Sequence, residues 1–126
     1  MSNNKHILIV DDEPDMVEWL TSFFEDNGYK TSFAHDGFDG FEKTLAEKPD
    51  LITLDISMDK ESGIKMYRKL HDSEETNKIP VIIISGVSPE LKGFIERRKQ
   101  VDPPAGYFEK PVDKDKLLET VKRLIG

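Results

Sequence analysis

The chain has 126 residues, a formal net charge of −7 and no cysteine. This length suits one compact domain, expected over residues 1–126, and the lack of cysteine excludes disulfides and thiolate metal sites. No apolar run is long enough to cross a bilayer and no secretory signal is recognisable, so we expect a cytoplasmic protein without a membrane partner. The acidic balance weighs against direct binding to nucleic acid, because that attraction depends on clustered lysine and arginine.

Five short apolar runs have the length of strands, and runs such as ILIV, LITL and VIII lack internal alternation, which is typical of strands covered on both faces in a parallel sheet. The runs are 6–10, 29–34, 51–54, 81–84 and 107–108. Helical spacing of apolar residues follows each run, and the first helix is expected from Pro14 to a stop at Gly28. The expected inner faces carry Val17, Leu20, Phe23 and Phe24; Phe38, Phe41 and Leu45, before Pro49; Ile64, Tyr67 and Leu70, after Gly63; Leu91, Phe94 and Ile95; and Leu117, Leu118, Val121, Leu124 and Ile125.

The alternation of strands and helices predicts an α/β fold, with five helices covering both faces of a doubly wound parallel sheet. Ligands of such folds bind beyond the carboxyl ends of the strands. Polar residues follow the predicted strands at that edge, and we expect them to face one another. They are Asp11 and Asp12 after the first strand, Asp55 after the third, Ser85 at the end of the fourth and Lys110 after the fifth.

Carboxylates at neighbouring strand ends repel one another unless a cation lies among them, and oxygen ligands at this density suit Mg²⁺. An aspartate beside Mg²⁺ can accept a phosphoryl group, so Asp55 is the predicted nucleophile. Lys110 and the Ser85 hydroxyl are expected to meet the phosphoryl oxygens. Taken singly, each residue also has a structural interpretation: Asp12 as a cap of the first helix, Ser85 bonded to backbone and Lys110 as a solvated charge.

Together, these residues resemble the receiver domain of two-component response regulators, over essentially the whole chain. The resemblance rests on the acidic pair, on Asp55 with a glycine eight residues later, on Ser85-Gly86, on Tyr107 and on Lys110-Pro111. It implies a flavodoxin-like sheet with strand order 2-1-3-4-5.

For the metal, the resemblance implies that Asp12 and Asp55 bind Mg²⁺ directly with the backbone carbonyl of Ser57, and that Asp11 binds it through water. Asp55 would receive the phosphoryl group from a phosphohistidine on a sensor histidine kinase or a histidine phosphotransfer protein. The protein would thereby assist its own phosphorylation and dephosphorylation, without being an enzyme acting on other substrates.

For the switch, the resemblance implies that Lys110, joined to Pro111 by a cis bond, pairs with Asp55 or its phosphoryl group. Ser85 would move toward the phosphoryl oxygens and Tyr107 would turn inward, which changes the populations of two states. The changed surface would bind a downstream target protein. Candidate contacts besides Tyr107 are the residues Lys92, Phe94, Arg97 and Arg98 of the fourth helix, although a charge run is also typical of a solvated face.

One position departs from the family pattern, because Asp59 stands where the loop after Asp55 usually carries proline. A further carboxylate there would alter Mg²⁺ affinity or the lifetime of the acyl phosphate, unless Asp59 points to water.

A start at Met1 and a finished last helix favour a free-standing receiver, but they leave a second interpretation open. The chain could be the regulatory part of a longer DNA-binding response regulator. Three further classes share the fold or the chemistry: a phosphohydrolase with an aspartyl-phosphate intermediate, a flavodoxin-like cofactor binder and an interaction module that is never phosphorylated.

Overall fold

The computed structural model describes residues 5–55, 60–85 and 105–126, with side chains described for 5–55, 63–84 and 105–126. Five parallel strands form one sheet in the order β2-β1-β3-β4-β5, which confirms the predicted topology. The strands are β1 (His6–Val10), β2 (Lys30–Ala34), β3 (Leu51–Leu54), β4 (Val81–Ser85) and β5 (Gly106–Glu109).

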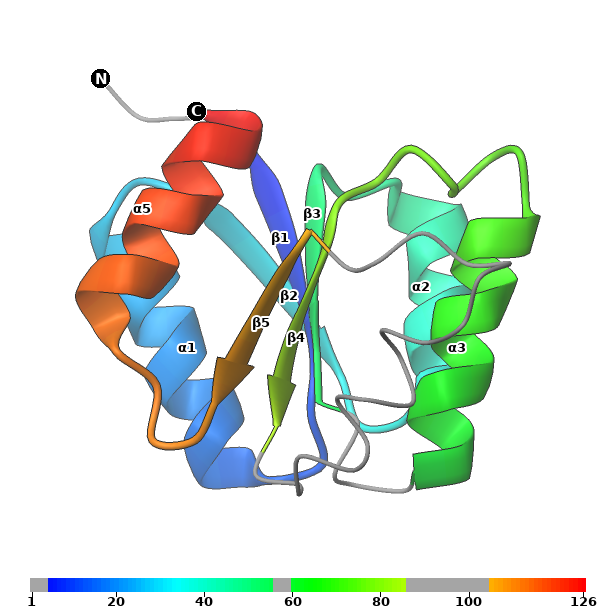
Figure 1. Cartoon of the computed structure of the whole chain (residues 1–126), viewed down its shortest axis with the longest axis horizontal. Coiled ribbons are helices and arrows are strands. Elements are labelled where there is room, and N and C mark those ends of the chain that lie inside the picture. Colours follow the sequence, from blue (N-terminus) through cyan, green and yellow to red (C-terminus); the bar gives the residue numbers. More distant parts are fainter. Residues whose placement is uncertain (1–4, 56–59, 86–104) are drawn as a thin grey trace.

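Four helices lie in the described part of the chain, and they pack against both faces of the sheet (Figure 1). The helices α1 and α5 cover one face, and α2 and α3 cover the other. The fourth predicted helix, with Leu91, Phe94 and Ile95, lies outside the described residues. None of the helices described is long and apolar enough to span a membrane. The bounds are α1 (Pro14–Asp26), α2 (Gly37–Glu47), α3 (Lys60–Asp72) and α5 (Lys114–Ile125).

Alternate residues of β1 supply the two halves of the core. Ile7 and Ile9 pack with α1 and α5, whereas Leu8 and Val10 pack with α2 and α3. All four side chains are buried because both faces of the sheet are covered. The continuous apolar runs of the sequence therefore indicated the correct type of sheet.

The inner face of α2 agrees with the prediction only in part, since Phe41 packs against the core but Phe38 does not. Phe38 is 70% exposed, and the buried positions are Gly37, Gly40 and Thr44. The helix approaches its neighbours so closely that a Cβ atom at Gly40 would lie 2.8 Å from the sulfur of Met66. Small residues therefore occupy the contact line, and the aromatic ring of Phe38 is turned to solvent.

The helix ends agree closely with the signals in the sequence. The helix α1 ends at Asp26, and Gly28 then takes a φ of 91°. The last residue of α2 is Glu47, after which Lys48 adopts the left-handed conformation with a φ of 50°. The start of α3 at Lys60 is three residues earlier than the predicted start near Gly63.

Candidate functional site

Two buried aspartates lie where the central strands end. The N–H group of Asp55 donates to the carbonyl oxygen of Val10 at 2.9 Å, and that of Asp11 donates to the carbonyl oxygen of Ala34 at 3.1 Å. These bonds continue the pairing of β1 with β3 and β2 by one residue. Asp11 and Asp55 are each only 1% exposed, so both carboxyl groups are taken out of bulk water.

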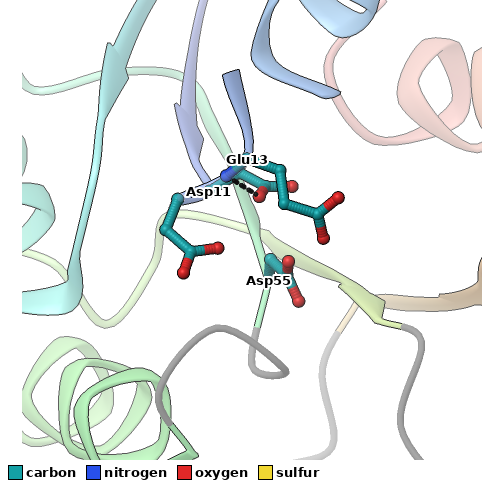
Figure 2. A group of neighbouring side chains, drawn as sticks. Asp11, Glu13 and Asp55 are labelled. Carbon is teal, nitrogen blue, oxygen red and sulfur yellow. Dashed lines mark hydrogen bonds between the residues drawn. The ribbon is translucent and has the colours of Figure 1, made fainter. Parts of the chain in front are cut away.

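The start of α1 adds a residue that the sequence pattern did not single out. The N-cap is Glu13, which makes no side-chain capping bond, and Asp12 is an exposed residue ahead of it. Interpreting Asp12 as the cap was therefore wrong. The N–H group of Glu13 instead donates to Oδ1 of Asp11 at 2.9 Å (Figure 2). This bond holds the first turn of the helix beside the end of β1.

Four carboxylates meet at this edge of the sheet, and Figure 2 shows three of them approaching one another. One oxygen from each of Asp11, Asp12, Glu13 and Asp55 lies within 4.8 Å of the others. Oδ2 of Asp11 is buried and accepts no hydrogen bond from the described residues, so a cation or its bound water would satisfy it. Carboxylate oxygens are the hard donors that suit Mg²⁺, which usually binds one or two carboxylates and keeps several waters.

Lys110 closes the cluster from the end of β5. Its Nζ lies 2.9 Å from Oδ2 of Asp55, 2.9 Å from Oε1 of Glu13 and 3.6 Å from Oδ2 of Asp11. Burial lowers the pKa of Lys110, but its hydrogen bonds to Glu13 and Asp55 outweigh burial and leave the pKa above its usual value. The ammonium is thus fixed in its charged form. The predicted cis bond between Lys110 and Pro111 is confirmed.

The carboxyl group of Asp11 is strained electrostatically. Its pKa is raised to about 7, mainly by burial and also by the nearby charge of Asp55, while the N–H of Glu13 and the charge of Lys110 oppose this effect. An ionised Asp11 therefore costs free energy in the metal-free protein. A divalent cation among the carboxylates would remove that cost.

The remaining predicted site residues are placed only in part. The backbone of Ser85 ends β4 opposite Glu109, but its side chain lies outside the described residues. Tyr107 is half-buried and packs against the core on the side of α2 and α3. The predictions for Ser57, Asp59, Lys92, Phe94, Arg97 and Arg98 also lie outside the described residues.

Fold and site define a flavodoxin-like α/β protein with an acidic cluster and a lysine at the carboxyl edge of its sheet. The chain belongs to the response regulator receiver domain family of two-component signalling, whose sequence profile matches residues 7–122. This finding confirms the resemblance seen in the sequence.

The chain is similar to proteins of about its own length over nearly their whole sequences. The chain is 35% identical over 120 residues to protein PilH of Pseudomonas aeruginosa, covering 95% of this chain and 97% of PilH. It is 30% identical over 122 residues to the polar-differentiation response regulator DivK of Brucella anthropi, covering 97% of each. The structure of the Francisella response regulator 1452 receiver domain matches with a TM-score of 0.79 and 30% identity, covering 97% of each chain.

Proposed function

We propose that the protein is a free-standing cytoplasmic receiver that takes a phosphoryl group onto Asp55 in the presence of Mg²⁺. The observation that carries this proposal is the distance of 2.9 Å between Nζ of Lys110 and Oδ2 of Asp55, inside a cluster of carboxylates. Nearly complete coverage of PilH and DivK supports a free-standing receiver over a part of a DNA-binding regulator.

In the transfer, a carboxylate oxygen of Asp55 attacks the phosphorus atom of a phosphohistidine on a sensor kinase or phosphotransfer protein. The new P–O bond forms as the P–N bond breaks, and the electron pair of that bond stays on the imidazole. Asp12, Asp55 and the backbone carbonyl of Ser57 would hold Mg²⁺ directly, and Asp11 would hold it through water. The ion supplies positive charge that reduces repulsion between the carboxylate and the incoming phosphoryl group.

Lys110 is the residue placed to bind the phosphoryl group once it is attached. Its ammonium already contacts Oδ2 of Asp55, so a short shift brings it to a phosphoryl oxygen. The Ser85 hydroxyl would bind a second oxygen, and Tyr107 would turn further into the core. This movement would change the target-binding surface, to which we assign Tyr107 and, from the predicted fourth helix, Lys92, Phe94, Arg97 and Arg98.

Intact mass spectrometry tests the acceptor directly. The protein is incubated with acetyl phosphate in the presence and absence of Mg²⁺, beside Asp55→Asn and the control Asp26→Asn. Asp26 is an exposed aspartate at the end of α1. Its replacement makes the same change in net charge as Asp55→Asn but leaves the acidic cluster intact. We expect the wild type and the control to gain one phosphoryl mass only with Mg²⁺, and Asp55→Asn to gain none. Modification of Asp55→Asn to the wild-type extent would refute the assignment.

The phosphohydrolase interpretation predicts a different result with the same purified protein. It requires repeated turnover of small phosphate esters, whereas a receiver is modified once for each slow cycle of its own acyl phosphate. Phosphate release from such esters is measured with the protein present at a small fraction of the ester concentration.

A further inference from the structure

Glu13 shares the ammonium of Lys110 with the proposed acceptor. Its Oε1 and Oδ2 of Asp55 each lie 2.9 Å from Nζ of Lys110. The contact joins residues 97 positions apart, from the start of α1 to the end of β5. One ammonium thus divides its hydrogen bonds between a buried carboxylate and one that is 59% exposed.

Local structure does not explain why Glu13 faces Lys110. Glu13 is the N-cap of α1, but its side chain makes no capping bond to its own helix, and glutamate is not one of the preferred capping residues. Its backbone is held by the bond from its N–H group to Asp11. The backbone of Glu13 is therefore held by Asp11, while its carboxylate contacts Lys110.

We propose that Glu13 determines which phosphodonors the site accepts, by neutralising Lys110 and disfavouring donors of high negative charge. This inference rests on the proposed function. When its carboxylates are ionised, the cluster of Asp11, Asp12, Glu13 and Asp55 exceeds by one charge the sum of Lys110 and a bound divalent cation. Replacing Glu13 with glutamine would make that set neutral.

The consequence differs between donors because Coulomb repulsion scales with the charge of the donor. Phosphoramidate, and a phosphoimidazole whose ring is protonated, each carry one negative charge fewer than acetyl phosphate at neutral pH, because a proton on nitrogen offsets part of the phosphoryl charge. The negative charge of Glu13 therefore slows the reaction of acetyl phosphate more than that of the two nitrogen-linked donors. Glu13 is thus a specificity-determining residue that favours nitrogen-linked phosphoryl groups over acyl phosphates.

The test compares initial phosphorylation rates of the wild type, Glu13→Gln and Glu18→Gln with acetyl phosphate and with phosphoramidate, at saturating Mg²⁺. Glu18 is an exposed glutamate of α1, and its replacement makes the same change in net charge. For Glu13→Gln we expect acetyl phosphate to react about 3- to 10-fold faster and phosphoramidate to change less, so that the ratio of the two rates shifts. The shift should shrink as salt is raised, since an exposed charge is screened.

A second measurement needs neither metal nor donor. In the metal-free protein, the ¹⁵N-¹H signal of Lys110 Nζ should be protected from solvent exchange by its two carboxylate partners. Exchange should become faster in Glu13→Gln and stay unchanged in Glu18→Gln. An unchanged signal in Glu13→Gln would show that the ion pair does not hold in solution.

The outcomes separate the two proposals. If the wild type is phosphorylated but the ratio of rates is equal in Glu13→Gln and the wild type, this inference is wrong and the proposed function stands. If neither donor modifies any of the three proteins, the proposed function fails and the inference fails with it.

Discussion

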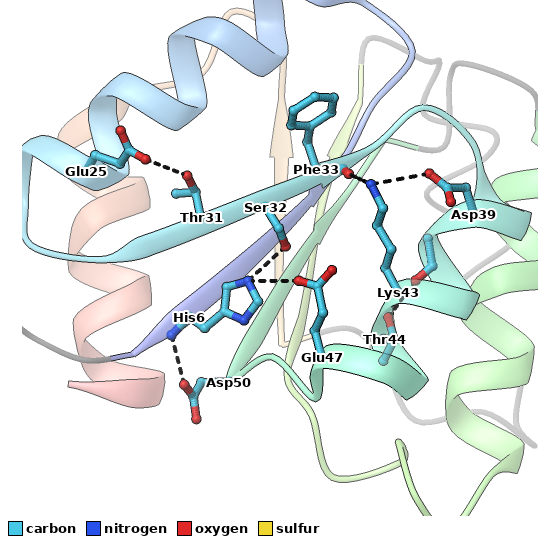
Figure 3. A network of polar contacts seen from close by, with 11 residues as sticks. His6, Glu25, Thr31, Ser32, Phe33, Asp39, Lys43, Thr44, Glu47 and Asp50 are labelled. Carbon is cyan, nitrogen blue, oxygen red and sulfur yellow. Dashed lines mark hydrogen bonds and ion pairs between the residues drawn. The ribbon is translucent and has the colours of Figure 1, made fainter.

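The amino ends of the parallel strands form one edge of the sheet, called here the amino edge, and their carboxyl ends form the carboxyl edge. The two edges differ in how their polar side chains are paired. At the amino edge, the Nε2 atom of His6 lies 2.8 Å from Oγ of Ser32 and 3.4 Å from Oε1 of Glu47 (Figure 3). The backbone N–H group of His6 donates to Oδ2 of Asp50 at 2.8 Å. Ser32, Glu47 and Asp50 come from three different segments, and each contacts His6. The amino edge is thus a complete structural network.

At the carboxyl edge, the polar groups are not balanced by the protein. Four carboxylates converge there, and Lys110 is shared among three of them. Like charges in a buried site raise the free energy of the folded state unless a cation or a proton is added. The amino edge therefore stabilises the fold by itself, whereas the carboxyl edge needs a ligand to reach full stability.

Removing Lys110 should disrupt the carboxyl edge most severely. In Lys110→Ala, the buried charges of Asp55 and Asp11 lose their ammonium, so we expect the metal-free protein to lose about 2–4 kcal/mol of unfolding free energy. Mg²⁺ should restore part of that loss. Urea unfolding with and without the ion measures both, beside Lys122→Ala on the exposed face of α5 as the control. Equal stabilities of the two variants without metal would contradict the expected role of Lys110.

The pH dependence of Asp11 follows from the same imbalance of charge. Its pKa rises from 3.8 to about 7 on folding, so the folded protein binds this proton more tightly than the unfolded chain does. The contribution of Asp11 to stability is therefore greatest at low pH and falls as pH rises from about 4 to 7. At pH 8 without metal, we expect Asp11→Asn to be more stable than the wild type, by about 1–3 kcal/mol.

Adding Mg²⁺ provides the control for Asp11→Asn, because the gain in unfolding free energy is compared between the wild type and the variant. Saturating Mg²⁺ should stabilise the wild type more than the variant and so narrow or reverse the difference. Urea unfolding at pH 5 and pH 8, each in EDTA and in Mg²⁺, gives the four free energies for each protein. A variant less stable than the wild type in EDTA at pH 8 would show that Asp11 is not electrostatically strained.

A substitution in the His6 network at the amino edge should change stability by the same amount with and without Mg²⁺. Ser32→Ala removes the hydroxyl that lies 2.8 Å from Nε2 of His6, and we expect a loss of about 0.5–1.5 kcal/mol. Phosphorylation of Asp55 should keep its wild-type rate, because Ser32 lies in a separate network. A loss that Mg²⁺ reverses would mean that the two edges are coupled.

Two buried threonines outside both groups of polar residues give the smallest contrast. The Thr53 hydroxyl has no hydrogen-bond partner among the described residues, whereas that of Thr76 donates to the carbonyl oxygen of Leu70 at 2.6 Å. Thr53→Val should therefore stabilise the protein by about 0.5–1 kcal/mol, while Thr76→Val should destabilise it by about 1 kcal/mol. Thermal unfolding of both variants measures the difference. The same sign for both would argue against an unsatisfied hydroxyl at Thr53.

Much of the fold could be predicted because its signals are local. The apolar runs located β1 and β3 to the residue, and glycine or proline marked the ends of α1 and α2. The strand order came from the resemblance, since five parallel strands permit several orders. The buried face of α2 was predicted correctly at Phe41 but missed at Gly40, because apolar periodicity follows large side chains, whereas the close contact at Gly40 requires a small one.

The sequence predicted most of the residues that meet at the site, but it did not predict all of the contacts between them. Strand ends brought Asp11, Asp55 and Lys110 together as expected. Glu13 was missed, because nothing in a linear sequence shows that its side chain crosses to Lys110 and leaves its helix uncapped. The one signal in the sequence was its position after an acidic pair and before Pro14.

The cluster draws its members from β1, β3, β5 and the first turn of α1, which no contiguous fragment of moderate length contains. The Mg²⁺ binding proposed above would therefore be a property of the assembled chain, with the ion as a ligand of the native state alone. Magnesium would then protect this protein against proteolysis, and a substitution far from the cluster that loosens β5 would be detected first as weakened metal binding.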